Sequence, residues 1–295
     1  MRLVRVASEL RVLLKPLRGQ KGRIGFVPTM GFLHEGHASL IRNCRLRCDT
    51  VVVSVFVNPL QFGADEDFGR YPHDLENDQA LCLNQGVTAL FIPEQKEIYP
   101  TGFNTFIDPG QMGEALCGRD RPGHFRGVAT VVGKLLNIVQ PDLVFFGQKD
   151  LQQAAIVRRM IRDLNLPVEL VVTPTVRDAD GLATSSRNIY LSPADRARAL
   201  CISRALFAAE EAFRKGVRSA EELVNMARGL MTELDEVQYC ELADAMTMDP
   251  LEGQVGRLAG LCVAGKIGKT RLIDNLLLSE ASDPTRLLSL AALPD

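Results

Sequence analysis

The sequence predicts an α/β fold, in which a Rossmann-like, doubly wound parallel sheet is followed by a smaller α+β domain. Up to about residue 175, short β-branched runs alternate with amphipathic stretches, which is the pattern of right-handed βαβ crossovers. Beyond that point two helical stretches come first and strand-like runs follow, as in an α+β unit. The chain has 295 residues, enough for two domains, which we expect at 1–176 and 177–295.

The first elements follow from the spacing of apolar residues. Leucines at i, i+3, i+4 and i+7 predict a helix over Ser8–Leu17, and Ile24–Pro28 reads as a strand. A second helix begins near Gly36, and Thr50–Val57 is β-branched almost throughout, as expected for a strand buried on both faces. Further strands are expected at 89–92, 143–146 and 168–172, with helices at 74–84, 129–139 and 151–164.

The last third of the chain has a different order of elements. Residues 193–235 contain two helical stretches rich in Ala, Glu and Arg, and strands are expected at 238–242, 258–263 and 270–276. The loop Thr175–Ala183 is the expected join between the two domains.

Composition excludes several classes of protein. The 34 Lys and Arg nearly balance the 36 Asp and Glu, and the net charge of −2 argues against a nucleic acid as the main partner. No apolar run approaches the roughly 20 residues of a membrane span, and charges interrupt the N-terminal stretch where a secretory signal would be apolar. Seven scattered cysteines without a C-x-x-C pair are typical of reduced thiols, so we expect a cytoplasmic protein without membrane or nucleic-acid partners.

The segment Pro28–His37 (PTMGFLHEGH) carries the most information about function. It lies where the first long strand ends and a helix begins, a place where open α/β sheets bind anions. Gly31 and Gly36 allow close approach of the backbone, and His34 and His37 can reach one phosphate. A zinc-protease site is excluded, because it needs histidines at i and i+4. We therefore expect a phosphate site here rather than two structural histidines.

Two other strand ends carry polar residues. Asn58 and Gln61 follow the second buried strand, although Asn-Pro is also a common start of a turn. Lys149 lies in Gly147–Asp150 with Gln153 one helical turn further on, so both could face one site. The alternative, equally weighted, is that Asp150 caps the next helix and Lys149 is solvated.

Two loops complete the set of candidates. Thr184–Asn188 offers two hydroxyls and an arginine that could hold phosphate oxygens, or it could serve only as a helix-capping turn. The acidic run Asp65–Asp67 is expected to be a solvated loop rather than a metal cluster.

Six segments together resemble the pantothenate synthetase (pantoate–β-alanine ligase) family along nearly the whole chain. The H-x-G-H element is shared with a broad nucleotidyltransferase superfamily, whereas the six segments in this order are far more specific. They are Pro28–His37, Val55–Gln61 (VFVNPLQ), Arg121–Val132 (RPGHFRGVATVV), Gly147–Asp150 (GQKD), Ser185–Asn188 (SSRN) and Gly268–Asn275 (GKTRLIDN).

The resemblance implies a Rossmann-like domain with a C-terminal lid domain, a homodimer and a requirement for Mg²⁺. It also implies a reaction in which ATP and pantoate give pantoyl adenylate and pyrophosphate, and β-alanine then gives pantothenate and AMP. The expected chemical contributors are His37, matching the family's proton donor, and His34, Lys149 and Arg187. The implied ATP contacts are Met30, Gly31, Phe32, Leu33, His34, Glu35, Gly36, His37, Gly147, Gln148, Lys149, Asp150, Val176, Thr184, Ser185, Ser186 and Arg187.

The resemblance also implies the acid-binding residues and a weak metal candidate. Gln61 and Gln153 match the pantoate contacts, with Asn58 close by, and Gln61 is also matched to β-alanine. Asp78 is the candidate for helping to hold Mg²⁺, unless it is only a carboxylate on a helix surface.

The chain departs from the family pattern at three positions. His73, Thr184 and Leu151 stand where the family usually has Arg, an apolar residue and an aromatic residue, so affinity could be altered.

The alternative function is another H-x-G-H nucleotidyltransferase acting on a small carboxylic acid or phosphate. A synthetase-like RNA-binding protein and a non-catalytic ATP sensor are the remaining hypotheses; the charge of −2 opposes the first, and intact His34 and His37 oppose the second.

Overall fold

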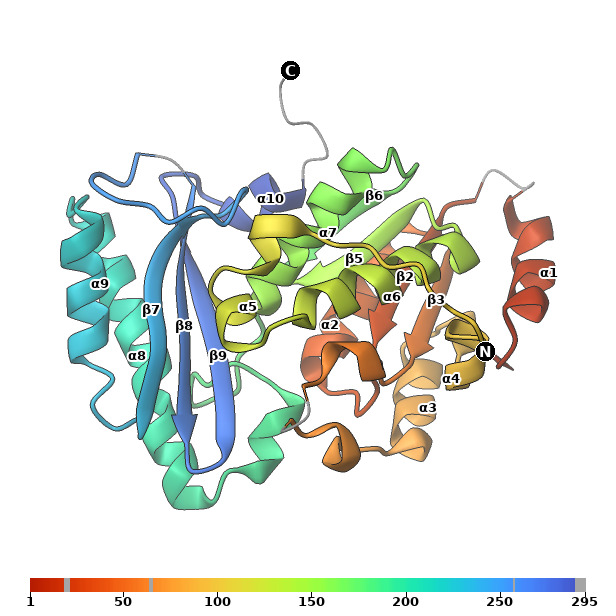
Figure 1. The fold of residues 1–295 in the computed structure, drawn as a ribbon, viewed down its shortest axis with the longest axis horizontal. Helices are drawn as coiled ribbons and strands as arrows, with labels where there is room; N and C mark the ends of the chain where they lie inside the picture. Colours follow the sequence, from red (N-terminus) through yellow and green to blue (C-terminus); the bar gives the residue numbers. More distant parts are fainter. Residues whose placement is uncertain (19–21, 64–65, 257, 290–295) are drawn as a thin grey trace.

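Two sheets organise the computed structural model. Within the residues that the structure describes (1–18, 22–63, 66–256 and 258–289), six parallel strands form the larger sheet and three antiparallel strands form the smaller one. Figure 1 shows the two sheets side by side, with α8 and α9 covering the outer side of the smaller sheet. The predicted fold class is therefore confirmed. The strands are β1 (Arg2–Val4), β2 (Ile24–Thr29), β3 (Thr50–Val55), β4 (Ala89–Phe91), β5 (Leu143–Gly147), β6 (Glu169–Thr173), β7 (Glu236–Asp244), β8 (Ala259–Ile267) and β9 (Thr270–Leu278).

The order of the larger sheet fixes where a ligand can bind. The strands run β1-β4-β3-β2-β5-β6, so the chain winds in one direction from β2 and in the other from β5. Ligands of open α/β sheets bind beyond the carboxyl ends of the strands where the winding direction reverses. Those ends are the start of the H-x-G-H segment, after β2, and the GQKD segment, after β5.

Helices cover both faces of the larger sheet. Alternate residues of each strand point to opposite faces, so Phe26 packs with α1, α6 and α7, whereas Val27 packs with α2. The helices are α1 (Ala7–Arg18), α2 (Glu35–Arg47), α3 (Leu75–Asn84), α4 (Gln95–Ile98), α5 (Cys117–Asp120), α6 (His124–Val139), α7 (Leu151–Asp163), α8 (Pro193–Arg214), α9 (Ala220–Gly229) and α10 (Pro284–Ser289).

The smaller sheet lies between α8 and α9 on one face and α7 on the other. Leu261 and Val263 of β8 pack with α8 and α9, and Cys262 joins the core that contains α7. Gly260 of β8 lies so close to Leu151 of α7 that an added Cβ would be 2.5 Å from Leu151 Cδ2. The predicted domain boundary between 176 and 177 falls in the connection from β6 to α8, and it stays a prediction.

Sequence reasoning placed the main elements well and missed short or irregular ones. The short edge strand β1 and the helices α4, α5 and α10 were not predicted. The expected start of this helix, Ala129, lies five residues after the observed start of α6 at His124. In the structure Gly127 is required for packing, since an added Cβ would lie 2.2 Å from the carbonyl oxygen of Leu60.

Among the helices of the described residues, none combines enough length with enough apolar character to cross a bilayer.

The contact between Gly127 and Leu60 leads to a stability prediction. We expect Gly127→Ala to lower the free energy of unfolding by about 1–3 kcal/mol, because the backbone of 59–61 must move to admit the methyl group. Gly229→Ala is the matched control, since Gly229 ends an exposed turn of α9 with open space around it, and a gain of up to about 1 kcal/mol is expected. Urea unfolding measures both, and equal effects of the two substitutions would contradict the packing argument.

Candidate active site

A cavity of about 780 Å³ opens at the carboxyl ends of β2 and β5 and extends to the smaller sheet. It brings together most of the residues that the sequence singles out, from five separate segments of the chain. Those lining it are Met30, His34, Gly36, His37, Asn58, Gln61, Gly147, Lys149, Asp150, Gln153, Val176, Thr184, Ser185, Ser186 and Arg187.

The two histidines cap the helix on which they lie. The Nδ1 atom of His34 accepts a hydrogen bond from the backbone N–H of Gly36 at 3.1 Å, and Nδ1 of His37 accepts from the N–H of His34 at 3.2 Å. The rings lie against each other with their centroids 4.1 Å apart. Because each Nδ1 accepts, each proton of the neutral ring is on Nε2, which is left to donate to a ligand in the cavity.

Electrostatics favours the neutral form of both rings. Burial, reinforced by the cation of Lys149, lowers the pKa of His34 to about 4. Burial and the neighbouring His34 hold the pKa of His37 well below its usual value. Both rings are therefore neutral hydrogen-bond donors at pH 7 in the ligand-free protein.

Asp78 holds the H-x-G-H loop from behind. Its carboxylate accepts hydrogen bonds from the N–H of Phe32 at 3.0 Å and of Leu33 at 2.6 Å. The side chain is 2% exposed, so the alternative of a carboxylate on a helix surface is wrong. Gly31 has φ +87° and lies so close that an added Cβ would be 3.0 Å from the Asp78 carboxylate. Burial raises the pKa of Asp78, against these two bonds.

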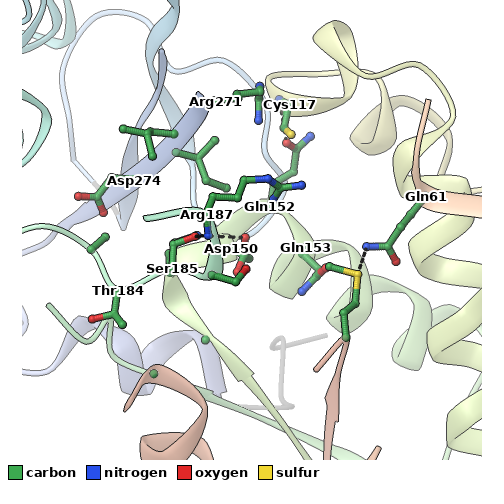
Figure 2. Close-up of a pocket in the computed structure, with 18 of the residues that line it drawn as sticks. Gln61, Cys117, Asp150, Gln152, Gln153, Thr184, Ser185, Arg187, Arg271 and Asp274 are labelled. Carbon is green, nitrogen blue, oxygen red and sulfur yellow. Dashed lines mark hydrogen bonds and ion pairs between the residues drawn. The ribbon is translucent and has the colours of Figure 1, made fainter. Parts of the chain in front are cut away.

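Asn58 fixes the direction of the Gln61 amide. Asn58 Nδ2 donates to Gln61 Oε1 at 3.0 Å and to the carbonyl of Gly127 at 3.1 Å, and Asn58 Oδ1 accepts from Tyr99 at 2.7 Å. The Nε2 group of Gln61 is thereby turned to the cavity, where it lies 3.1 Å from the sulfur of Met30. Figure 2 shows Gln61 and Gln153 approaching the same side of this space. Asn58 therefore acts behind Gln61 in this structure, with its own polar atoms already occupied.

Two residues of the RPGHF segment hold the backbone of Gln61, and sequence reasoning gave neither a role. His124 Nδ1 lies 2.7 Å from the carbonyl oxygen of Gln61, and Arg121 donates to the same oxygen at 3.2 Å. Burial, reinforced by Arg121, lowers the pKa of His124 to about 3. The signal that could have found them is a histidine and an arginine beside a Gly-containing helix start, in a segment already known to match the family.

Asn275 of β9 fixes the GQKD segment. Its Nδ2 donates to the carbonyl oxygens of Gln148 at 2.9 Å and Lys149 at 2.8 Å. The side chain of Gln148 is buried and bonds to Asn275 and Thr285, so it supports the segment without lining the cavity. Asn275 was missed as a functional residue, although a buried polar residue within an apolar strand pattern is a usable signal.

Lys149 and Asp150 both face the cavity. The ammonium group of Lys149 lies 3.8 Å from the carboxylate of Asp150, and the lysine side chain is only 19% exposed. Asp150 stands at the N-cap position of α7, as the alternative interpretation has it, but its side chain makes no bond to the start of the helix. The interpretation of Lys149 as a solvated lysine is wrong, since its side chain is largely buried.

The SSRN segment is held by a loop from the first third of the chain. Ser185 accepts from the N–H of Arg187 at 3.3 Å, so the capping interpretation of this segment is correct as well. Arg187 forms two bonds to Asp67, and Arg121 pairs with Glu66. Glu66 and Asp67 are thus partly buried in ion pairs, which corrects the expectation of a solvated loop; Asp65 lies outside the described residues.

Two connections tie the neighbourhood of Val176 to the smaller sheet and to α8. Arg177 forms two bonds with the buried carboxylate of Asp274, at 2.6 and 3.1 Å. Thr184 donates to Asp178 at 2.6 Å, and Asp178 also accepts from Arg196. An apolar residue in place of Thr184 would lack the first of these bonds.

Five of the expected nucleotide contacts do not line the cavity with this geometry. Glu35 is exposed and pairs with Arg42, whereas the backbone N–H groups of Phe32 and Leu33 bond to Asp78. Of the departures, His73 is exposed with its ring against Tyr71, and Leu151 is buried against Gly260. The five expected contacts outside the cavity lining are Gly31, Phe32, Leu33, Glu35 and Gln148.

Comparisons with known proteins agree with this site. The family model for pantoate–β-alanine ligase matches residues 2–277. Pantothenate synthetase 1 of Bradyrhizobium diazoefficiens is 53% identical over 279 residues, which cover 95% of this chain and 99% of the relative. The pantothenate synthetase of Pelotomaculum thermopropionicum is 51% identical, covering 92% of this chain and 97% of the relative.

Solved structures give the same answer. The pantothenate synthetase of Thermus thermophilus superimposes with a TM-score of 0.87 at 47% identity, covering 94% of this chain and 99% of that one. The pantoate–β-alanine ligase of Francisella tularensis, solved with β,γ-ATP and β-alanine, has a TM-score of 0.76 at 35% identity and covers 94% and 97%. On these matches, and with the predicted segments gathered around one cavity, the chain belongs to the pantoate–β-alanine ligase family.

Proposed function

We propose that this protein is an ATP-dependent ligase that condenses pantoate with β-alanine to form pantothenate. In the first step the pantoate carboxylate attacks the α-phosphorus of ATP, so that pyrophosphate leaves and pantoyl adenylate forms. In the second step the neutral amine of β-alanine attacks the acyl carbon, a proton is lost from nitrogen, and AMP leaves. The observation that carries the proposal is the meeting of the H-x-G-H, GQKD and SSRN segments with Gln61 and Gln153 in one cavity.

The first step needs charge neutralisation rather than a base. A carboxylate is already ionised at neutral pH, so it must be held in line with the α-phosphorus while charge on the phosphate oxygens is stabilised. The Nε2–H groups of His34 and His37, the start of α2 and the cations of Lys149 and Arg187 supply that stabilisation. This makes the two histidines electrostatic contributors, and His37 a donor of a hydrogen bond.

The acid is recognised by amides. Gln61 presents Nε2 to the cavity because Asn58 holds its oxygen, and a substrate carboxylate or hydroxyl would replace the sulfur of Met30 as its partner. Gln153 supplies a second amide from α7. Amides left without partners would disfavour analogues that lack the hydroxyls of pantoate.

We propose that Mg²⁺ accompanies ATP. Among the described carboxylates that line the cavity, Asp150 has only Lys149 at 3.8 Å as an ion-pair partner, whereas Asp67 and Asp274 are each bonded twice to an arginine. One carboxylate together with substrate phosphates is a usual set of ligands for Mg²⁺. Asp150 fits this role better than Asp78, whose two oxygens already accept backbone N–H groups. When bound, the ion would neutralise charge on the phosphates.

Three further proposals concern the assembly, location and domain organisation of the protein. A homodimer is implied by the family resemblance, and sedimentation at equilibrium would test it. A cytoplasmic location is supported by seven cysteines that are all free and buried. A lid formed by residues 177–295 is supported by the separate core of the smaller sheet with α8 and α9.

The proposed reaction is tested directly by its products. The purified protein with ATP, Mg²⁺, pantoate and β-alanine should release AMP and pyrophosphate in equal amounts, and only when pantoate is present. Product that retains AMP would instead indicate the alternative nucleotidyltransferase, and release independent of pantoate would contradict the ligase.

A second prediction separates the two tasks of His34. His34→Asn keeps an oxygen that can cap α2 but cannot reach a phosphate, so we expect kcat/KM for ATP to fall about 10²-fold at unchanged Tm. His34→Ala should show the same loss and also lower stability by about 1 kcal/mol, because the cap is removed. Steady-state kinetics and thermal unfolding measure the two effects. Unchanged turnover in both variants would leave His34 with a structural role alone.

The depressed pKa values lead to a prediction about pH. Burial lowers the pKa of His34 to about 4 and, together with the neighbouring His34, holds the pKa of His37 well below its usual value. Both rings therefore stay neutral as pH falls from 8 to 6. We expect the ratio of kcat/KM for ATP between the unaltered protein and His37→Gln to stay constant over that range. A ratio that decreases as pH rises through 6–7 would mean that a protonated imidazole is the active form.

A further inference from the structure

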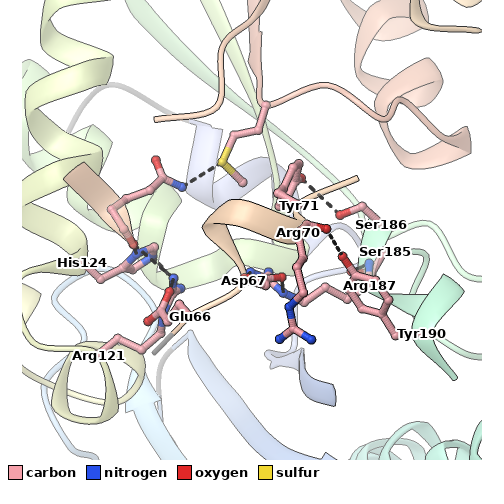
Figure 3. A network of polar contacts seen from close by, with 12 residues as sticks. Glu66, Asp67, Arg70, Tyr71, Arg121, His124, Ser185, Ser186, Arg187 and Tyr190 are labelled. Atoms are coloured by element: carbon pink, nitrogen blue, oxygen red, sulfur yellow. Dashed lines mark hydrogen bonds and ion pairs between the residues drawn. The ribbon is translucent and has the colours of Figure 1, made fainter. Parts of the chain in front are cut away.

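One segment from the first third of the chain is fastened across the cavity to the SSRN segment. We call Asp67–Tyr71 the latch segment; it includes the short 3₁₀ helix that begins at Phe68. Figure 3 shows it facing Ser186, Arg187 and Tyr190. Three contacts join the two sides, namely Asp67 with Arg187, the carbonyl of Arg70 with the Tyr190 hydroxyl at 2.9 Å, and the Tyr71 hydroxyl with Ser186 Oγ at 3.2 Å.

The contact between Asp67 and Arg187 is a two-pronged ion pair. Nε of Arg187 lies 3.0 Å from Asp67 Oδ2, and Nη2 lies 2.9 Å from Oδ1. The Arg187 and Asp67 side chains are 27% and 18% exposed, so solvent screens the pair only in part. Parallel bonds of this kind are directional as well as strong, and they fix the plane of the guanidinium group.

Asp67 is an anion when the site holds no ligand. Burial by itself would raise the pKa of Asp67, but the Arg187 guanidinium outweighs this and holds the pKa below its usual value. Within the described part of the chain, no comparable partner restrains Lys149, whose ammonium group is 3.8 Å from Asp150. In the cavity Arg187 is thus already neutralised, whereas Lys149 is more loosely paired.

A carboxylate and a phosphate present the same recognition feature to an arginine. Each offers two oxygens that match the Nε and Nη2 edge of the guanidinium group. That edge of Arg187 cannot bond to Asp67 and to a phosphate of ATP with both prongs at the same time. A phosphate that binds Arg187 through this edge therefore competes with Asp67.

We propose that Asp67 is a positioning residue that occupies the phosphate-binding edge of Arg187 until ATP displaces it. The inference rests on the proposed function, since it takes ATP as the ligand. Before ATP binds, Asp67 keeps the Arg187 guanidinium group oriented and competes with weakly binding anions for it. On binding, the phosphate releases Asp67 and loosens the contacts of the latch segment with Ser186 and Tyr190, so that admission to the cavity depends on the charge of the nucleotide.

The test is to remove the charge of Asp67 and keep its shape. We expect Asp67→Asn to bind ATP about 3–10-fold more tightly, because a neutral amide competes poorly for Arg187. Adenosine, which has no phosphate, should bind with unchanged affinity. In the background of Arg187→Ala the same substitution should have no effect on ATP binding. Calorimetric titration of the four proteins with ATP and with adenosine gives all of these values.

Two further variants keep the test decisive. Glu76→Gln removes one negative charge from an exposed position on α3, and it should leave ATP affinity unchanged. Tyr190→Phe serves as the second variant should Asp67→Asn fold poorly. It removes the bond to the carbonyl of Arg70 without touching Asp67, and we expect about a twofold gain in ATP affinity.

The outcomes are distinct. Weaker ATP binding by Asp67→Asn, similar to that of Arg187→Ala, would overturn the inference, because Asp67 would then support Arg187 in the bound state. If the unaltered protein binds ATP and neither Asp67→Asn nor Tyr190→Phe changes the affinity, the inference is overturned and the proposed function stands. Failure of the unaltered protein to bind ATP would overturn the proposed function together with the inference.

Discussion

The backbone N–H groups at the start of α2 impose the constraint on which the site depends. The first N–H groups of a helix have no partner within it. Here the imidazoles of His34 and His37 accept hydrogen bonds from two N–H groups at the helix start. This use of Nδ1 sets the tautomer of each ring and directs Nε2 to the cavity. Asp78 then satisfies the two preceding N–H groups, so the entire turn is held without any ligand. The turn that caps α2 is also the proposed phosphate site.

The fold was largely predictable because it depends on periodicity. The β-branched run at 50–57 could only be a strand buried on both faces, and the order of strands and helices required parallel crossovers. The expected helix at 129–139 left out Gly127, which lies in the first two turns of α6. Its true role is close contact with the backbone of Leu60, which belongs to a segment 67 residues earlier in the sequence. Local propensity has no access to such a contact.

The candidate site, too, could be predicted from the sequence only in part. The loops that meet at the edge of the sheet were found from the residues after each strand, because parallel strands bring their carboxyl ends together. The partners of those loops were not found, since each lies far away along the chain. Asp67 lies 120 residues from Arg187, and Asn275 lies 126 residues from Lys149. Sequence patterns identified the groups that face the ligand, whereas the groups that hold them in place required the structure.

The hydrogen bonds of Asn275 and Thr285 to the GQKD segment make the proposed nucleotide site dependent on residues that follow the larger sheet in the sequence. A stop codon that removed residues from 270 onward would leave every residue of the larger sheet in place. It would nevertheless delete the strand that orients the backbone of Lys149 and the threonine that holds Gln148. Residues 270–285 must therefore be synthesised before the lysine can adopt its position, so a nascent chain with a complete parallel sheet still lacks part of the proposed ATP site.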